Sequence, residues 1–307
     1  MEYEIKNGYL KVRIAPKGGE LRSVCDKYGQ EYLWQGDAAT WQGHGPNLFP
    51  YVGRLTGGAY LYQKQIYHMG IHGFLMNMEM KPVSCERDTL VMELCACEET
   101  RRQYPFLFAL RIQWQLRKES LEITYQLRNQ DEKTMYFGIG GHPGFRIPLE
   151  EGLAFEDHYL DFGKESEPLS LGLSEDNFMS GRDIPFPLRE KRYLDLSREL
   201  FVKDSVVLRE TSRQVTLRSR QGTKAIRVEY PGMTYLVLWV WPGREVSFLC
   251  LEPWSSLPSR KNVTEDLEAQ SDLISLEAGN IYENKWSISI LNKKDIKDRK
   301  NFSYLLA

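Results

Sequence analysis

The sequence predicts an all-β protein made of antiparallel sheets, with few short helices. Two observations lead to this prediction. Apolar and polar residues alternate along many short segments, and turn-forming residues separate these segments at spacings typical of antiparallel sheets. Such alternation indicates a half-buried strand, because successive side chains of a strand point to opposite faces of its sheet. Two sheets that bury their apolar faces against each other form a two-layer β-sandwich.

The alternating segments run along the whole chain. They cover residues 10–14, 106–116, 121–127, 215–217, 226–230 and 288–290. Turn formers separate them, for example at residues 17–19, 128–131 and 230–232. Residues 235–241 are apolar at every position, which indicates a central strand covered on both faces.

The chain shows no low-complexity linker and no internal repeat, so we expect one β-sandwich domain over residues 1–292. Residues 150–192 lack clean periodicity and contain prolines and many charges, which predicts a long excursion of loops that could border a site. Residues 293–307 begin with mixed charges, and we expect a solvated tail without a function of its own.

Composition excludes several classes of partner. Among the 307 residues, Lys and Arg total 40 against 42 for Asp and Glu, a formal charge of -2, so no basic field attracts nucleic acid or an anionic membrane. No stretch approaches the roughly 18 apolar residues of a membrane span, and the N-terminus lacks a secretory pattern. We expect a soluble, cytoplasmic protein with a small, neutral partner.

The five cysteines are an odd number at scattered positions, which suits a reducing compartment better than a disulfide framework. Cys95 and Cys97 are two residues apart in an alternating stretch, so both would point to one face of a strand. A metal site needs further ligands, and we expect these two cysteines to be small buried residues instead.

His142 lies in the segment Gly140-Gly141-His142-Pro143-Gly144-Phe145. The proline biases His142 toward an extended backbone, and the glycines allow a ligand or a second backbone to approach closely. Histidine titrates near neutral pH, so a ring held in this frame is a candidate acid-base group. The alternative is a tight turn whose histidine satisfies a hydrogen bond in the core. The segment alone does not decide between them.

Glu252 ends the apolar run 246–251 and precedes Pro253 and Trp254. A carboxylate in such surroundings is poorly solvated, and desolvation raises its pKa toward the range of a general base at neutral pH. The alternative is an ion pair at a strand end, for instance with Arg260. Trp254 offers a flat apolar face of the kind on which sugar rings lie, although core packing explains a tryptophan equally well.

His68 and His72 are four residues apart, a spacing that forms a metal pair on a helix. Gly70 and Gly73 argue against a helix here, and no carboxylate follows His68 as in the metalloprotease pattern. We therefore expect no metal, and interpret His72 as a hydrogen-bond donor on a loop.

Arg54 follows a glycine in the apolar segment 47–55. Its guanidinium carries five donors in a rigid fork and stays charged, which suits recognition of hydroxyl or carboxylate groups.

The order of four motifs resembles the aldose 1-epimerase (galactose mutarotase) family, in its bacterial LacX-like branch. The motifs are Asn-Leu-Phe-Pro-Tyr-Val-Gly-Arg-Leu at 47–55, His-Gly-Phe at 72–74, Gly-Gly-His-Pro-Gly-Phe at 140–145 and Leu-Glu-Pro-Trp at 251–254. The resemblance implies a galactose-mutarotase-like β-supersandwich that binds a free hexose and interconverts its α and β anomers without a cofactor.

The resemblance also implies roles for individual residues. Glu252 would remove the proton of the anomeric hydroxyl, while His142 protonates the ring oxygen and so opens the ring. His72 would assist at the ring oxygen, and Arg54 would bind sugar hydroxyls. Asp204 lies where the family often has a hydroxyl-binding aspartate, although a plain turn aspartate fits its position as well.

Two segments depart from the family pattern. The branch commonly continues His-Gly-Phe with Ala-Arg, whereas Leu75, Met76 and Asn77 follow here. The glycine-bearing stretch expected after Trp254 is replaced by residues 255–258, Ser-Ser-Leu-Pro. Both changes are expected near the pocket rim, so the sugar preference and its phosphorylation state stay open.

The main hypothesis is therefore a hexose mutarotase, an isomerase of carbohydrate metabolism that acts on a monosaccharide as a monomer or homodimer. With one acid and one base, its rate would show a bell-shaped pH dependence. The alternative is a non-catalytic carbohydrate-binding or sensing protein on the same fold, which would not need both groups. A glycoside-cleaving enzyme usually needs two carboxylates, and only Glu252 stands out.

Overall fold

The computed structural model describes residues 1–292, so the predicted charged tail at residues 293–307 lies outside the described residues. Antiparallel strands dominate the described part, which also contains the short α-helix α1 (Glu98–Gln103) and brief 3₁₀ turns. The predicted all-β class, with antiparallel sheets and few short helices, is confirmed. No helix within residues 1–292 is long and apolar enough to cross a membrane.

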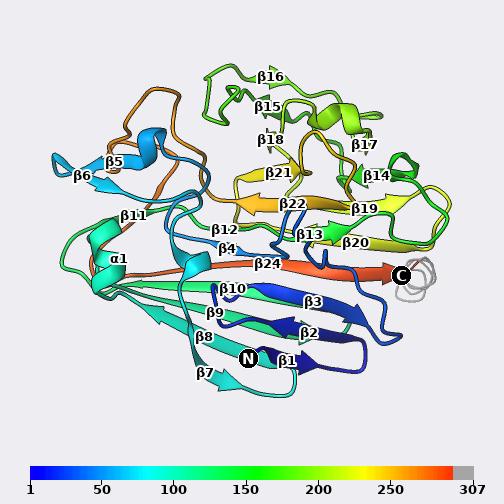
Figure 1. Ribbon diagram of the computed structural model, residues 1–307, viewed down its shortest axis with the longest axis horizontal. Helices are drawn as coiled ribbons and strands as arrows, with labels where there is room; N and C mark the ends of the chain where they lie inside the picture. The colour runs from blue at the N-terminus through cyan, green and yellow to red at the C-terminus, as the bar shows by residue number, and fades with distance from the viewer. Residues whose placement is uncertain (293–307) are drawn as a thin grey trace, which may run out of the picture.

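The strands follow the chain in order (Figure 1). Their bounds are β1 (Tyr3–Lys6), β2 (Leu10–Ile14), β3 (Leu21–Asp26), β4 (Asn47–Leu48), β5 (Ala59–Tyr62), β6 (Gln65–His68), β7 (Lys81–Cys85), β8 (Thr89–Cys95), β9 (Phe108–Arg117), β10 (Ser120–Asn129), β11 (Met135–Phe137), β12 (Gly140–Gly141), β13 (Gly144–Arg146), β14 (His158–Asp161), β15 (Leu169–Leu171), β16 (Ile184–Pro185), β17 (Tyr193–Asp195), β18 (Val206–Arg209), β19 (Gln214–Ser219), β20 (Lys224–Glu229), β21 (Tyr235–Trp239), β22 (Phe248–Trp254), β23 (Ile274–Leu276) and β24 (Ile281–Asn292). The 3₁₀ turns are η1 (Thr56–Gly58), η2 (Leu75–Asn77), η3 (Phe155–Asp157) and η4 (Arg198–Phe201).

Two large sheets form the body of the protein. One has nine strands in the order β17-β14-β19-β20-β24-β10-β9-β8-β7, and the other has the order β16-β15-β18-β21-β22-β12-β4, with β13 also paired to β22. Apolar side chains from both sheets, such as Trp114 and Tyr125 from the first and Phe248 and Leu251 from the second, belong to one buried core. A smaller three-stranded sheet, β1-β2-β3, contributes Val12 to the same core.

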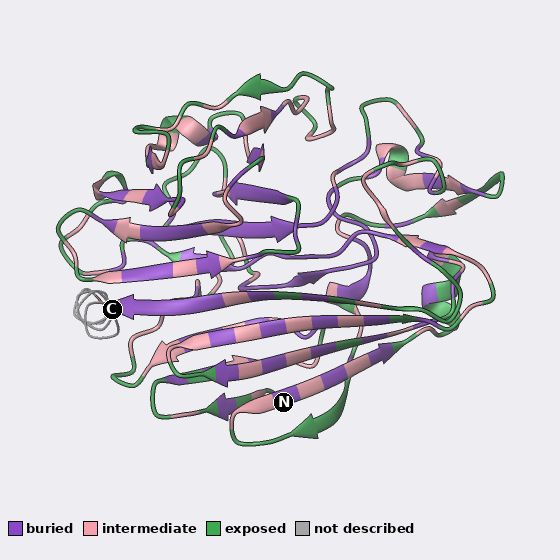
Figure 2. Cartoon of the chain, turned by 180° about the vertical axis from the view of Figure 1, so that it is seen from behind, coloured by how far each residue is buried: buried purple, intermediate pink, exposed green. Residues whose placement is uncertain are grey.

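Burial follows the patterns expected from the sequence. Buried residues alternate with more exposed ones along β9 and β10, as the striped strands of Figure 2 show. In contrast, every residue of β22 is buried. Strand β21 lies between β18 and β22 with four of its five residues buried, which confirms the predicted central strand.

Two local predictions need correction. Cys95 and Cys97 are exposed rather than buried. Strand β8 ends at Cys95, and the chain then turns into α1, where the Cys97 N–H donates a 2.9 Å hydrogen bond to Thr100. The excursion at residues 150–192 is also not purely loops, because β14 within it pairs with β17 and β19 of the nine-stranded sheet.

Asn47 connects the two large sheets through hydrogen bonds of its side chain. Its side-chain amide is buried, donates to the carbonyls of Gly18 and Gly19 at 3.1 and 2.8 Å, and accepts from the Tyr125 hydroxyl at 2.8 Å. Tyr125 belongs to β10 and also donates to the carbonyl of Gly140 in β12 at 3.1 Å. One polar cluster therefore links the nine-stranded sheet to β4 and β12 of the other sheet.

Replacement of Asn47 by alanine is expected to lower the free energy of unfolding by about 2–4 kcal/mol, because two buried carbonyls lose their donor. Equilibrium unfolding in urea measures the change. Tyr125→Phe is the matched control: it removes only one hydroxyl of the same cluster and is expected to cost about 1 kcal/mol. An Asn47→Ala variant as stable as the parent would contradict the assigned role.

Candidate active site

A cavity of about 300 Å³ opens beside β22 and is lined by the site residues that the sequence predicts. All six predicted site residues line it: Arg54, His72, His142, Asp204, Trp254 and Glu252. They come from β22 and from loops that are far apart in the chain. The sequence-based selection therefore corresponds to one place in the folded molecule.

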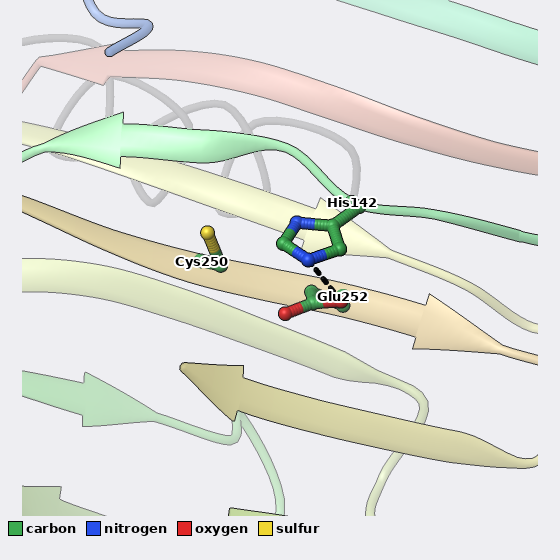
Figure 3. A group of neighbouring side chains, drawn as sticks. All are labelled: His142, Cys250 and Glu252. Carbon is green, nitrogen blue, oxygen red and sulfur yellow. Dashed lines mark ion pairs between the residues drawn. The ribbon is translucent and has the colours of Figure 1, made fainter. Parts of the chain in front are cut away.

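The centre of this site is a contact between His142 and Glu252. Glu252 belongs to β22, and His142 lies between β12 and β13, both of which pair with β22. The His142 Nε2 atom is 3.2 Å from Glu252 Oε2 (Figure 3). Glu252 is 1% exposed and His142 8% exposed. The contact is thus almost fully removed from solvent.

The glycines around His142 are required by close packing. A Cβ atom on Gly140 would lie 2.8 Å from the carbonyl oxygen of Pro253, and one on Gly141 would lie 2.5 Å from the Trp286 ring. On Gly144 it would lie 2.5 Å from the Trp41 ring. The glycines therefore let β12 and β13 lie against β22 and the opposite sheet, which sets the position of His142.

Aromatic rings hold the His142 side chain. The ring centroids of Trp41, His72 and Trp239 lie 5.0, 5.5 and 5.6 Å from its own. The second ring nitrogen, Nδ1, is buried and has no hydrogen-bond partner among the described residues. The ring is therefore oriented by packing and by Glu252, and not by a hydrogen bond at Nδ1.

Burial sets the protonation of the pair. It lowers the pKa of His142 to about 4. It raises the pKa of Glu252 well above its usual value, an effect opposed by the Trp254 N–H, which donates to Glu252 at 3.1 Å, and reinforced by the charge of Asp204. Both shifts disfavour the charged forms, so a single proton on the pair is favoured on Glu252 over His142.

The alternative partner of Glu252 is excluded by the structure. Arg260 forms its ion pair with Glu265, at 2.8 Å. The pairing of Glu252 with His142 in place of an arginine leaves a carboxyl group that can gain and lose a proton.

His72 is a neutral donor. Its Nδ1 accepts a 3.1 Å hydrogen bond from the Gly53 N–H, which places the ring hydrogen on Nε2. Burial lowers the pKa of His72 well below its usual value, and the nearby His142 and Arg54 lower it further. It lies on a loop with φ of 62°, as expected for a non-helical position, and His68 ends strand β6.

Asp204 occupies a turn and also lines the cavity. Its backbone has φ of 83°. Its Oδ1 accepts from the Trp239 indole at 2.7 Å, and its Oδ2 accepts from the Asn177 amide at 2.8 Å. The Asp204 carboxylate is therefore held by two hydrogen-bond donors at the cavity wall.

Arg54 and Trp254 differ in exposure. Arg54 is exposed at the cavity, whereas Trp254 is 5% exposed and commits its indole N–H to Glu252. Trp254 therefore orients the carboxyl group in addition to offering an apolar wall.

Both segments that depart from the family pattern reach the cavity. Met76 and Pro258 each line it, which agrees with the expected position near the rim. Three further lining residues, Trp41, Asn177 and Trp239, were not selected from the sequence. They belong to no recognisable motif, although Asn177 falls in the excursion that was expected to border a site.

Cys250 is the third donor group near the pair (Figure 3). It precedes Glu252 by two residues on the same face of β22, and one ligand atom from each of His142, Cys250 and Glu252 lies within 4.8 Å of the others. Burial raises the pKa of the Cys250 thiol well above its usual value. The Cys250 thiol therefore stays protonated beside the His142–Glu252 pair.

Comparisons with known proteins agree with the fold and the motifs. A family model described as aldose 1-epimerase matches residues 1–287. The plasmid-encoded protein LacX of Lactococcus lactis subsp. lactis is 34% identical over 304 residues, which covers 95% of this chain and 100% of LacX.

Two solved structures show the same architecture. The galactose mutarotase related enzyme from Lactobacillus acidophilus has a TM-score of 0.91 at 29% identity, covering 95% of this chain and 98% of that one. A galactose mutarotase-like protein from Lactobacillus casei ATCC 334 has a TM-score of 0.89 at 26% identity, covering 94% and 100%. The expected galactose-mutarotase-like fold is confirmed.

The His72 ring is expected to stay neutral, with its hydrogen on Nε2, as the pH falls through the ordinary histidine range, because burial lowers its pKa. Two-dimensional ¹H–¹⁵N spectra of the imidazole nitrogens measure this, with His72→Gln used to assign the signals. A midpoint near 6.5, the ordinary value for histidine, would contradict the neutral donor.

Proposed function

We propose that this chain, which belongs to the aldose 1-epimerase family, interconverts the α and β anomers of a free hexose. The observation that carries the proposal is the buried contact of His142 with Glu252 at the wall of a cavity. The cavity volume of about 300 Å³ is at the lower end of the range for small-molecule sites, which suits one sugar ring.

Ring opening needs a base at the anomeric hydroxyl and an acid at the ring oxygen. The proposed reaction begins from the less populated tautomer of the pair, in which the shared proton lies on His142. Glu252 takes the hydroxyl proton while His142 gives its proton to the ring oxygen. The bond between the anomeric carbon and the ring oxygen breaks, and its electron pair stays on that oxygen. The products are the open-chain aldehyde, a protonated Glu252 and a neutral His142.

Ring closure uses the same groups in reverse. After rotation about the bond between the first two carbons, His142 takes the proton of the attacking hydroxyl and Glu252 returns its proton to the carbonyl oxygen. The other anomer forms, and the pair regains its first state. Burial favours the neutral state that ring opening produces, and no cofactor is needed to balance the protons.

The remaining residues bind and orient the sugar in this scheme. His72 donates from Nε2 to the ring oxygen region, and Arg54 and Asp204 bind hydroxyl groups.

A non-catalytic sugar-binding protein is the second candidate. The observation in its favour is Met76, which lines the cavity where the family branch commonly has arginine. Polarimetry of freshly dissolved α-glucose and α-galactose separates the two candidates. Sugar binding in calorimetry without any acceleration of mutarotation would favour the binding protein.

His142→Asn and Glu252→Gln are each expected to lower turnover by at least about a hundredfold, the usual contribution of a general acid or base. Circular dichroism verifies that the variants fold. His68→Asn and Glu283→Gln, which change exposed residues outside the cavity, are matched controls and should keep full activity. An active Glu252→Gln variant would refute the role of the base.

The pH dependence of kcat/KM is expected to be bell-shaped, with an acid limb below the ordinary histidine range. Activity requires one proton on the pair, and a second proton is added only near the His142 pKa of about 4. The last proton leaves as the pH rises through the raised pKa of Glu252, which places the alkaline limb above the ordinary carboxyl range. Polarimetry across pH 3 to 10 measures both limbs. An acid limb near 6.5, or an alkaline limb in the ordinary carboxyl range, would contradict this assignment.

A further inference from the structure

Trp41 lines the cavity and stacks on the His142 ring. The two ring centroids are 5.0 Å apart, and the interplanar angle is 33°. Trp239 and His72 also contact His142, but their rings stand nearly perpendicular to it, at 78° and 87°. Of these three rings, only Trp41 therefore presents its face to the face of the imidazole.

The backbone around Trp41 is built to hold its indole in this place. A Cβ atom on Gly43 would lie 2.6 Å from the Trp41 ring, and one on Gly144 would lie 2.5 Å from it. Both glycines therefore leave the space that the indole fills. The Trp41 carbonyl accepts hydrogen bonds from the Trp34 indole and from the Asp37 N–H, each at 2.9 Å.

The segment that follows Trp41 also holds the backbone of His142. The His142 N–H donates to the Pro46 carbonyl at 2.9 Å, and the Gly144 N–H donates to the His44 carbonyl at 2.8 Å. One stretch of chain thus fixes the indole and the imidazole relative to each other.

The proposed reaction needs His142 in its charged form, which burial disfavours. The Nδ1 atom of His142 has no hydrogen-bond partner among residues 1–292 that would support this charge. The face of an aromatic ring attracts a cation that lies within about 6 Å of its centroid, and tryptophan does so most strongly. The stacked indole of Trp41 lies within this distance.

The titratable groups around His142 come from several elements. They are Glu252 and Cys250 of β22, His72 of the loop after β6, and Arg54 and Asp204 of the cavity wall. His44, on the same segment as Trp41, faces Glu20 instead, at 3.8 Å. The carboxylate in contact with His142 is Glu252, and it competes for the shared proton. An indole face attracts the charged imidazole and takes no proton from it.

We propose that Trp41 is a positioning residue of the reaction, whose indole face stabilises the imidazolium form of His142. This inference rests on the proposed function and adds a residue to it. The productive tautomer has the shared proton on His142 and is the less populated one, so a contact that favours it raises turnover. Turnover should therefore depend on the aromatic face at position 41.

Trp41→Leu is expected to lower kcat about tenfold and to change KM by less than about twofold, because the lost contact acts on His142 and not on the sugar. Trp41→Phe keeps an aromatic face and should recover most of the turnover. Trp241→Leu is the matched control, since Trp241 packs against Trp239 and does not line the cavity. A raised KM with an unchanged kcat would make Trp41 a wall for the sugar and overturn the proposal.

The titration of His142 in the sugar-free protein gives a readout that does not depend on turnover. Spectra of the ¹⁵N-labelled imidazole nitrogens measure it, with His142→Asn used to assign the signals. Trp41→Leu is expected to lower the midpoint by about one pH unit, because the charged form loses its aromatic contact. If Trp41 only excluded water, its loss would solvate the ring and raise the midpoint instead, which would overturn the proposal.

The same titration separates this inference from the proposed function. A lowered midpoint in Trp41→Leu, together with a parent protein that does not accelerate mutarotation, would refute the proposed function and confirm the stabilised imidazolium.

Fluorinated tryptophans test the proposal without a change of shape, and serve if Trp41→Leu folds poorly. Site-specific replacement of Trp41 by mono-, di- and trifluorotryptophan withdraws electrons from the indole face and so weakens its attraction for a cation. Both kcat and the His142 midpoint should fall stepwise with the number of fluorine atoms. Values that stay constant along the series would contradict the role of the indole face.

Discussion

The buried contact between His142 and Glu252 is the interaction on which the proposed chemistry depends. Two titratable groups lie 3.2 Å apart at positions that are 8% and 1% exposed. Removal of one partner would leave the other buried without compensation, which is far more costly than exposure of the same group at a surface. The surrounding fold therefore has to hold both groups together, and the strand pairing and glycines around His142 serve this purpose.

Backbone pairing provides this support. β12 and β13 both pair with β22, so His142, which lies between these two short strands, is held directly beside the strand that carries Glu252. Gly140 lets β12 approach β22, because a Cβ atom there would collide with the Pro253 carbonyl oxygen, while Gly141 and Gly144 leave room for the Trp286 and Trp41 rings. Glycine in a strand normally weakens it, and here that cost is offset by the placement of an imidazole against a carboxyl group.

The sequence predicted the site best where chemistry and backbone constraints coincide. His142 precedes a proline between glycines, and Glu252 precedes a proline at the end of an apolar run. The surroundings of both residues could therefore be predicted from the sequence alone. Trp41, Trp239 and Asn177 could not be selected, because their roles depend on contacts between segments distant in sequence. Cys97 was misplaced for a related reason: alternation continues past Cys95, while the strand ends there and the chain turns to the Thr100 cap.

The electrostatics of the pair suit a reaction that must run equally well in both directions. In the proposed mechanism, ring opening converts an ion pair into two neutral groups and ring closure restores the ion pair. Desolvation penalises the ion pair, whereas attraction at 3.2 Å in a low dielectric favours it. These opposing effects bring the two states closer in energy than either effect alone would. An enzyme with a strongly preferred state would be trapped after half a cycle, so deep burial and direct contact have to occur together.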